Sequence, residues 1–218
     1  MKSGKIKHVG ASSHQIDIAK EIVKSNRFET IMFPFNFISD EAANELLPMA
    51  RKNDVGYIAM KTLAGGVLDN ANIAFKFFQN YPDVLLIPGI EKVSEIEEIV
   101  KIVEAGKPLT EEEKREGDRI KQELGTVFCR RCDYCQPCTS EIPISTVMHF
   151  NSIIKRMPPY RVFTGRFATV FDKAATCVEC GECEKRCPYH LPIMEIMKKN
   201  SEWYQREKEK YEKQTMQS

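Results

Sequence analysis

The first 128 residues of this 218-residue sequence contain no cysteine, because all eight cysteines stand at or after Cys129. No apolar run approaches the roughly 20 residues that a membrane-spanning helix requires, and the N-terminus lacks the apolar core of a secretion signal. The 32 Lys and Arg residues exceed the 31 Asp and Glu residues by one, so little net charge is present to attract nucleic acid or anionic lipid. We therefore expect a cytoplasmic protein that binds neither nucleic acid nor membranes.

The composition is that of a folded chain, since hydrophobic residues make up 42% of it and 12 Phe and 7 Tyr can fill a core. A chain of this length forms one ordinary domain or two small ones. Because cysteine is confined to the rear, we expect one domain over residues 1–107, a helical linker over 108–126 and a cysteine-bearing domain over 127–218.

The second group of cysteines has the spacing found in bacterial-type ferredoxins. Cys177, Cys180, Cys183 and Cys187 form the run CxxCxxCxxxC, and Pro188 follows it. Gaps of two residues let one short loop wrap a four-iron cube and place three thiolates on three of its irons. The fourth cysteine of such a run commonly binds the other cluster in proteins that hold two. The run therefore predicts a 4Fe-4S cluster and a partner run elsewhere in the chain.

The partner run lies upstream and reads CxxCxxCxxC, from Cys129 to Cys138. Its last gap is one residue shorter, and Thr139 stands where the proline would be. We expect two 4Fe-4S clusters whose fourth ligands are exchanged between the runs. The first cluster would be held by Cys129, Cys132, Cys135 and Cys187, and the second by Cys138, Cys177, Cys180 and Cys183.

Clustered cysteines can also form disulfide bonds or bind structural zinc. Disulfide bonds are disfavoured in a reducing compartment, whereas CxxC pairs do suit zinc. The ligands are flanked by four cations, Arg130, Arg131, Lys185 and Arg186. Positive charge there would stabilise a reduced cluster and raise its potential, or it is ordinary solvated loop charge.

The front half alternates short apolar runs with helical periods, which predicts successive βα units. The expected strands are Lys5–Gly10, Thr30–Phe33, Gly56–Met60 and Val84–Ile87. The expected helices are Gln15–Asn26, Asp40–Asn53, Asn70–Asn80 and Val93–Ala105. Four such units predict an α/β fold with a parallel sheet, half of a (β/α)8 TIM-type barrel, because a complete barrel needs about 200 residues or more.

Helix signals add detail to both halves. Ser94 and Glu97 are spaced to form a capping box at the fourth helix, and Gly106 should stop it. In the rear half, apolar spacing predicts helices over 144–155 and from 193 to about 213. With the cysteine loops, these helices would make an α-helical, ferredoxin-like dicluster module.

Three front segments resemble the fifth, seventh and eighth strand regions of aldo/keto reductases, in the same order. They are GKIKHVGASS (4–13), IAMKTLAGG (58–66) and IPG (87–89). The segment PLTEEE (108–113) resembles the family's exit from its barrel, where Thr110 and Glu113 are able to cap the next helix. The run CVECGECEKRCPYHLPI (177–193) is similar to the ferredoxin-like tail of an iron-sulfur subgroup of that family.

The resemblance implies a binding site for NAD(P)H or a flavin near the strand ends. Ser12 and Ser13 match positions that hold the nicotinamide carboxamide, and Phe35 matches an aromatic that stacks on the nicotinamide ring. The loop near the pyrophosphate would contain Lys61, Leu63, Gly65 and Gly66. Gly89 would open the turn toward an anion-binding helix N-terminus. Ordinary turn and barrel packing would also account for each of these residues.

No catalytic residue is assigned, because the family's catalytic Asp, Tyr, Lys and His lie before its fifth strand and have no counterpart here. His8 and His14 are better explained by structural roles. The resemblance implies the C-terminal part of an iron-sulfur aldo/keto reductase, which passes electrons between two 4Fe-4S clusters and a nicotinamide, a flavin or a redox partner protein. A missing N-terminal half-barrel would complete the sheet, or the exposed strands would cause self-association.

Two alternatives belong to other classes of protein. The chain would be a non-enzymatic, ferredoxin-like electron-transfer protein if the half-barrel served only for docking. It would be a zinc-stabilised fragment if the cysteines held zinc instead of iron.

Overall fold

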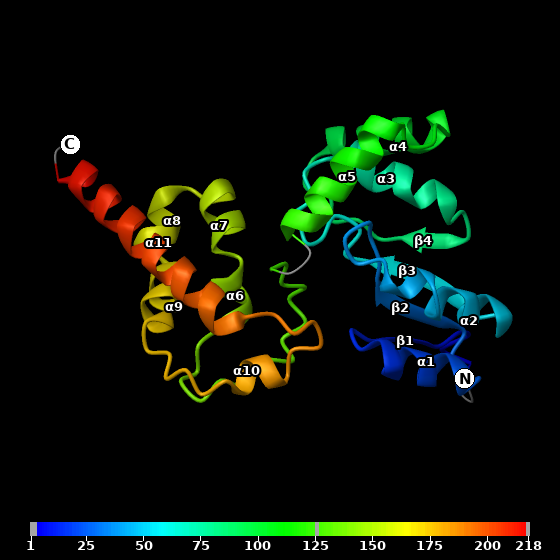
Figure 1. The fold of residues 1–218 in the computed structure, drawn as a ribbon, viewed down its shortest axis with the longest axis horizontal. Helices are drawn as coiled ribbons and strands as arrows, with labels where there is room; N and C mark the ends of the chain where they lie inside the picture. The colour runs from blue at the N-terminus through cyan, green and yellow to red at the C-terminus, as the bar shows by residue number, and fades with distance from the viewer. Residues whose placement is uncertain (1–3, 125–126, 217–218) are drawn as a thin grey trace. The chain divides into compact units, whose positions relative to one another are not determined.

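The computed structural model describes residues 4–124 and 127–216, and the chain divides into two compact units. The first unit is Met1–Thr126 and the second is Val127–Ser218. The first is an α/β structure, whereas the described residues of the second form helices and loops without a strand (Figure 1). Within the described residues, no helix is both long enough and apolar enough to cross a bilayer.

The first unit is built on a parallel sheet of four strands in the order β1-β2-β3-β4. The strands are β1 (Gly10–Ser12), β2 (Thr30–Pro34), β3 (Gly56–Met60) and β4 (Val84–Leu86). Each strand is followed by a helix, and every neighbouring pair is parallel. The predicted parallel α/β sheet is therefore confirmed, and the arrangement is consistent with half of a (β/α)8 barrel.

The predicted position of the first strand was wrong. The sequence placed it at Lys5–Gly10, whereas the ladder begins at Gly10, which pairs with Thr30. Before that point, Val9 joins the sheet only through its carbonyl, which accepts a hydrogen bond from the Glu29 amide at 2.8 Å. The strand therefore includes the small residues before the first helix, which apolar alternation does not reveal.

Five α-helices and two short 3-10 segments complete the described part of the first unit. They are α1 (Ile16–Lys24), η1 (Glu41–Ala43), α2 (Leu46–Lys52), α3 (Ala71–Phe77), η2 (Phe78–Asn80), α4 (Val93–Ala105) and α5 (Glu111–Leu124). Gly106 follows α4 with a φ of 59°, in the left-handed region that favours glycine, and it ends the helix as predicted.

The predicted capping box of Ser94 and Glu97 was wrong by two residues. The Glu95 carboxylate instead accepts hydrogen bonds from the backbone amides of Glu91 and Lys92, at 2.7 and 3.2 Å. Because the helix already starts before Ser94, Glu95 is the residue whose side chain can reach back to these amides.

One face of the sheet carries the core of the first unit. Ile31, Phe33 and Phe35 alternate along and just beyond β2, and all three are buried among apolar residues of α1 and α2. Phe35 is fully buried and makes edge contacts with four other rings. These rings are Tyr57, Phe77, Phe78 and Tyr81, at centroid distances of 5.8, 5.4, 5.7 and 4.9 Å.

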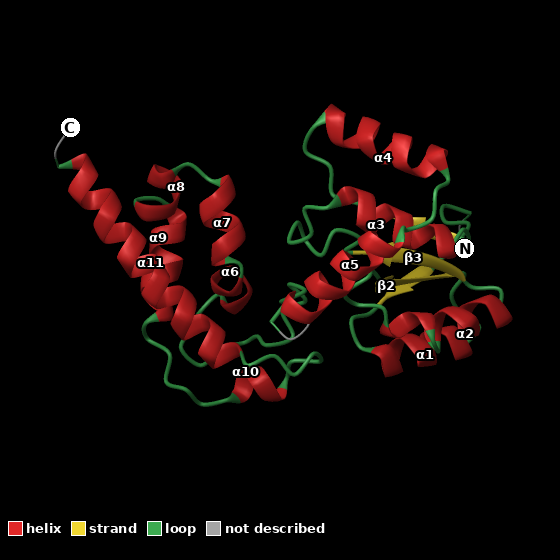
Figure 2. Ribbon diagram, turned by 45° about the horizontal axis from the view of Figure 1, so that its top comes forward, coloured by secondary structure: helices red, strands yellow, loops and turns green. Residues whose placement is uncertain are grey.

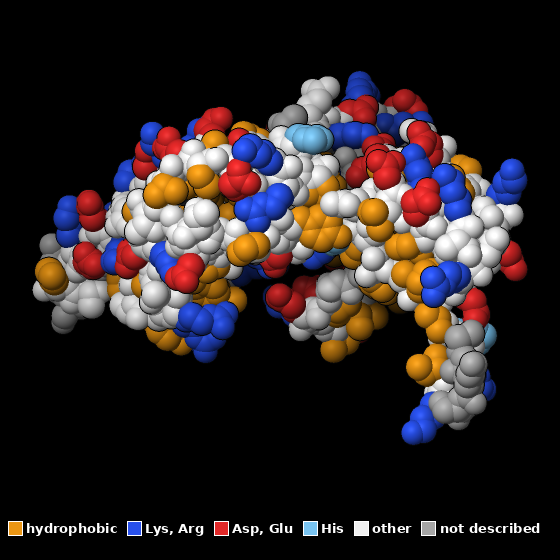
Figure 3. All heavy atoms as spheres, turned by 90° about the horizontal axis from the view of Figure 1, so that it is seen from below, with side chains coloured by type: hydrophobic (Ala, Val, Ile, Leu, Met, Phe, Trp, Pro, Cys, Tyr) orange, Lys and Arg blue, Asp and Glu red, His pale blue; other side chains and the backbone are white. Residues whose placement is uncertain are grey.

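The opposite face of the sheet is much less covered. One row across the strands consists of Ser12, Met32, Ile58 and Leu85, and none of these residues is buried. Leu85 is 60% exposed. Helix α4 also presents an exposed apolar stripe of Val93, Ile96, Val100 and Val103. Figure 3 shows apolar side chains at the molecular surface among the charged ones. Parallel sheets are normally covered on both faces, whereas helices bury only one face of this sheet. We call it one-sided for that reason.

Helix α5 packs onto α3 of the first unit. The Glu113 carboxylate accepts hydrogen bonds from Lys76 Nζ at 2.6 Å and from Asn72 Nδ2 at 2.5 Å. The predicted cap is present, because Thr110 N donates to Glu113 at 2.8 Å and Glu113 N donates to the Thr110 hydroxyl at 3.2 Å. Gly117 of α5 lies at this contact, where a Cβ would be in ordinary van der Waals contact with Ile73, at 3.5 Å.

The described residues of the second unit form a bundle of helices joined by loops (Figure 2). Aromatic side chains fill the core of this bundle. Its helices are α6 (Ile144–Met148), α7 (Phe150–Arg156), α8 (Pro159–Phe163), α9 (Arg166–Ala174), α10 (Glu182–Lys185) and α11 (Ile193–Thr215). Phe150 contacts Phe171 at 4.8 Å and Trp203 at 5.0 Å between centroids. Tyr204, fully buried, stacks on Phe171 at 5.0 Å.

The helix predicted over 144–155 is in fact two helices, separated at His149. His149 Nε2 lies 2.8 Å from the carbonyl oxygen of Cys129, and the ring is buried. The break therefore places an imidazole beside the first cysteine loop, a contact that apolar spacing does not reveal.

We predict that Glu113 stabilises the first unit in a pH-dependent way. The hydrogen bond from Lys76, followed by that from the Thr110 amide, lowers the pKa of Glu113 from 4.5 to about 2. A lowered pKa gives stability that is present above about pH 4.5 and is lost as the pH falls toward 2. The difference in unfolding free energy between wild type and Glu113→Gln should therefore shrink over that range.

Circular dichroism during urea unfolding at several pH values measures this difference. Glu112→Gln, at an exposed position of the same helix, is the matched control and should show no such narrowing. If the difference in unfolding free energy between wild type and Glu113→Gln stayed constant from pH 6 to pH 2, the stabilising role of the ionised Glu113 would be contradicted.

Candidate metal centre

The eight cysteines of the second unit line two separate hollows. The first hollow is lined by Cys129, Cys132, Cys135 and Cys187. The second hollow is lined by Cys138, Cys177, Cys180 and Cys183. Each hollow thus combines three cysteines of one run with the last cysteine of the other. This is the crossed grouping that the spacing predicts, whereas metal ligation itself stays a prediction.

The chain turns sharply inside each cysteine run. Arg131 and Asp133 have φ values of 51° and 59°, and Glu179 and Gly181 have values of 51° and 75°. Left-handed residues between the cysteines curl the backbone and turn its amides toward the sulfurs. The amide of Glu182 in this way lowers the pKa of the Cys180 thiol. At Cys129, Cys132 and Cys183, amide hydrogen bonds from Arg131, Tyr134 and Glu184 offset only part of the increase in pKa that burial causes.

Burial has the opposite effect on several of these thiols. It raises the pKa of Cys135 to about 12, and it also raises the pKa of Cys129, Cys132 and Cys183. Cys180 is exposed, and its pKa is lowered by the amide of Glu182 and by the hydroxyl of Thr139. Since the thiolate is the metal ligand, loading the buried thiols would release protons.

A set of polar contacts holds the loops that carry the cysteines. Gln136 makes two of them, because its Nε2 donates to the Ile142 carbonyl at 2.8 Å and its Oε1 accepts from the Cys138 amide at 2.9 Å. Arg186 Nη1 donates to the Pro137 carbonyl at 3.0 Å, which ties the two cysteine runs together. These bonds position Cys138 next to the second run.

The residues present fit an iron-sulfur cube. Each hollow offers four sulfur donors and is partly open to solvent. A 4Fe-4S cluster takes four cysteine thiolates, one on each iron. Among the described residues, no three His, Cys, Asp or Glu side chains gather closely enough to hold a single metal ion. The walls are otherwise largely apolar, and Ile144 lines both hollows.

The predicted nucleotide contacts all lie at or just beyond the carboxyl ends of the strands. Ser12 ends β1, Phe35 follows β2, Lys61 follows β3, and Gly89 comes after β4. In a parallel sheet these ends share one edge, so the structure places these residues along the same side of the sheet. Ser12 and Gly89 are exposed there.

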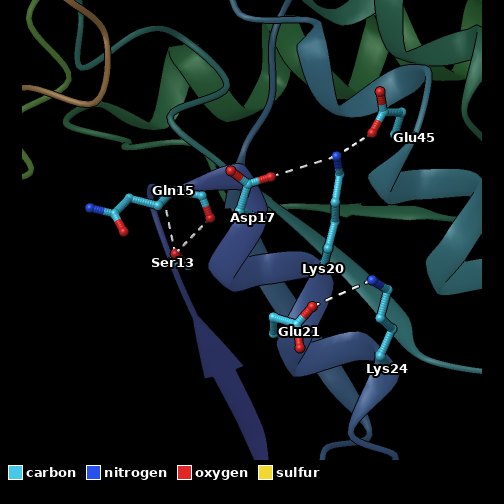
Figure 4. A network of polar contacts seen from close by, with 7 residues as sticks. All are labelled: Ser13, Gln15, Asp17, Lys20, Glu21, Lys24 and Glu45. Atoms are coloured by element: carbon cyan, nitrogen blue, oxygen red, sulfur yellow. Dashed lines mark hydrogen bonds and ion pairs between the residues drawn. The ribbon is translucent and has the colours of Figure 1, made fainter.

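Two of these residues have structural roles that compete with the predicted ones. Ser13 is 4% exposed, and its hydroxyl both accepts from the Gln15 amide and donates to the Gln15 carbonyl, each at 3.0 Å (Figure 4). In the same view Lys20 bonds Glu45 and thereby joins α1 to the start of α2. The Phe35 ring is fully buried in the aromatic core. Both side chains thus make contacts within the first unit, and their roles at a nicotinamide stay predictions.

The loop after β3 is a tight turn. The Lys61 carbonyl accepts from the Ala64 amide and the Leu63 carbonyl from the Gly66 amide, both at 2.8 Å. Gly65 and Gly66 have φ values of 67° and 84°, so both glycines stand where the backbone is left-handed. The turn leaves Gly65 exposed, which is compatible with a close approach of a phosphate.

Sequence reasoning missed two contacts at the hollows. They are the Thr139 hydroxyl 3.6 Å from the Cys180 sulfur and the Arg130 guanidinium above the Tyr189 ring. A signal existed only for Thr139, which replaces the proline of the motif. The contact of Arg130 with Tyr189 joins residues far apart in the sequence.

Comparison with known proteins agrees with both halves of this description. Residues 1–75 match the model of the aldo/keto reductase family, and residues 128–192 match the model of a 4Fe-4S dicluster domain. No curated protein and no solved structure matches the chain. The resemblance drawn from the sequence motifs is confirmed, and the two matches support iron-sulfur, metal-binding and oxidoreductase chemistry.

We predict that Gln136→Ala destabilises the second unit by about 1 to 2 kcal/mol, because it removes two hydrogen bonds and takes from the Cys138 amide its side-chain acceptor. Urea unfolding followed by the fluorescence of Trp203, the single tryptophan, measures this. Gln205→Ala is the matched control, since Gln205 makes one exposed contact of 3.4 Å. Equal midpoints for the two variants would contradict the positioning role of Gln136.

Proposed function

We propose that this chain is the C-terminal part of an iron-sulfur oxidoreductase related to aldo/keto reductases, and that residues 127–218 form a ferredoxin-like module with two 4Fe-4S clusters. The single observation that carries the proposal is the grouping of eight cysteines into two hollows with four thiols each. A bound 4Fe-4S cluster supplies one-electron transfer.

The residues around the hollows would hold, insulate and orient that group. The four thiolates of each hollow would bind the irons, and the backbone amides directed at the sulfurs would offset negative charge. Ile144 and Met148 would exclude water from the first hollow, and Met197 would do so in the second. Cys180 is exposed and Val178 is 68% exposed, so the second hollow would meet a redox partner at the surface of its unit.

The family of the first unit favours a nicotinamide nucleotide as the electron donor or acceptor. We place it at the carboxyl edge of the sheet, where Lys61, Gly65 and Gly89 would approach the phosphates. Leu63 and Gly66 would shape this loop, and Ser12 would contact the nicotinamide end. A flavin would fit the same chemistry. We assign no catalytic residue.

The one-sided sheet supports a further element of the proposal. Its uncovered row from Ser12 to Leu85 and the apolar stripe of α4 would be covered by a first half-barrel, or by a second copy of the chain.

The reduced state of all eight cysteines would be maintained in the cytoplasm.

Anaerobic iron and sulfide analysis of the whole chain tests the two-cluster proposal. We expect about eight of each per chain, brown colour, and a magnetic resonance signal after dithionite reduction. Colourless protein loaded with zinc would overturn the proposal and favour the zinc-stabilised alternative.

Two double variants test the crossed ligand sets. Cys138→Ala with Cys177→Ala removes two thiols from the second hollow and should leave about half of the iron. Cys138→Ala with Cys135→Ala removes one thiol from each hollow and should leave much less. The reverse order of iron contents would show that each run holds its own cluster.

Addition of NAD(P)H under anaerobic conditions separates an enzyme from an electron-transfer protein. Loss of visible absorbance on addition of NAD(P)H, slowed in Lys61→Met, would support a nucleotide site at the sheet edge. Lys52→Met, at an exposed lysine that ends α2, is the control and should leave the rate unchanged. Reduction by dithionite but not by NADH or NADPH would favour the non-enzymatic, docking alternative.

A further inference from the structure

The four cations that flank the cysteines are not equivalent. Arg131 and Lys185 are exposed and Arg186 is partly exposed, whereas Arg130 is buried with 7% of its surface exposed. Water screens an exposed charge, but a buried charge acts through a medium of low dielectric constant and is felt strongly by its neighbours. Arg130 is therefore the cation expected to act most strongly on its surroundings.

The Arg130 side chain is fixed between two aromatic residues. Its guanidinium carbon lies 3.9 Å from the centre of the Tyr189 ring and 5.1 Å from that of Phe128. Its Nη1 donates a hydrogen bond to the Phe128 carbonyl at 3.1 Å. A planar guanidinium stacks on rings in this way, whereas an ammonium group does not. The charge is thus held in one place.

That place is the wall of the first hollow. Arg130 lines it together with Cys129, Cys132, Cys135 and Cys187, and Tyr189 lines it as well. Asp133 also lines this hollow, but it is exposed and its charge is screened by water. The second hollow has no buried cation among its lining residues, because its Arg186 is partly exposed. Its one lining carboxylate, Glu182, is paired with Lys185.

Burying a guanidinium is costly unless opposite charge faces it. Thiolates around an iron-sulfur cube supply that charge, and reduction adds one more negative charge to it. We propose that Arg130, positioned by Tyr189, selectively raises the reduction potential of the cluster in the first hollow. The inference rests on the proposed two-cluster function and assigns unequal electrostatic environments to the two hollows.

A redox titration followed by magnetic resonance tests this inference on the whole chain with its clusters. In Arg130→Gln, the ratio of reduced to oxidised first cluster at a fixed potential should fall at least about tenfold, which is 59 mV for one electron. The other cluster should keep its potential. Arg131→Gln is the matched control, because Arg131 is adjacent but exposed, and it should change neither.

The Tyr189 pair gives a second readout if Arg130→Gln loses iron from the first hollow. Tyr189→Phe keeps the ring and should keep both reduction potentials of the wild type. Tyr189→Leu removes the ring and should lower the reduction potential of the cluster in the first hollow. An unchanged potential of the first cluster in Arg130→Gln would overturn the inference. If Arg130→Gln loses that cluster, an unchanged potential in Tyr189→Leu would overturn it. If the wild-type chain bound no iron, the proposed function itself would fail, so the two failures are distinguishable.

Discussion

The exchange of one cysteine between two distant runs is the constraint on which the second unit depends. Cys138 lies with the downstream run and Cys187 with the upstream run, although about forty residues of helices separate the runs. Neither hollow is complete without both loops. The helices from α6 to α9 therefore form the spacer whose packing brings the loops together, and the contact of Arg186 with Pro137 fixes their relative position. Any metal loading of this unit is consequently coupled to its folding.

The first unit depends mainly on the burial of apolar side chains against its sheet. Alternation along β2 directs Ile31, Phe33 and Phe35 into one core, and helices cover that face. The polar ends of the strands are then fixed by local bonds, such as those of the Ser13 hydroxyl with Gln15. Ser13, which resembles a nicotinamide-binding position of aldo/keto reductases, thus also holds the backbone where α1 begins. Family resemblance thus identifies the edge of the sheet better than it identifies individual contacts.

Local signals in the sequence were sufficient for much of this structure. Three strands and the span of α4 followed from apolar periodicity, and the cap of Thr110 and Glu113 followed from spacing. The first strand and the cap of α4 were misplaced, since pairing with β2 and the position of Glu95 decide them. The lining of the two hollows agrees with the crossed ligand sets that the motif spacing predicts, and the ligation itself stays a prediction. Burial of Phe35 and Arg130 could not be foreseen, because both depend on rings distant in the sequence.

Ile144 belongs to the walls of both hollows, so a single aliphatic side chain forms part of the partition between them. Electron tunnelling falls off steeply with the thickness of the barrier, so clusters bound in both hollows would exchange electrons across this shared wall. A redox protein would then need to dock at only one of them, and the more enclosed centre would fill through its neighbour. The two clusters would together store electrons and exchange them with a partner at a single docking site.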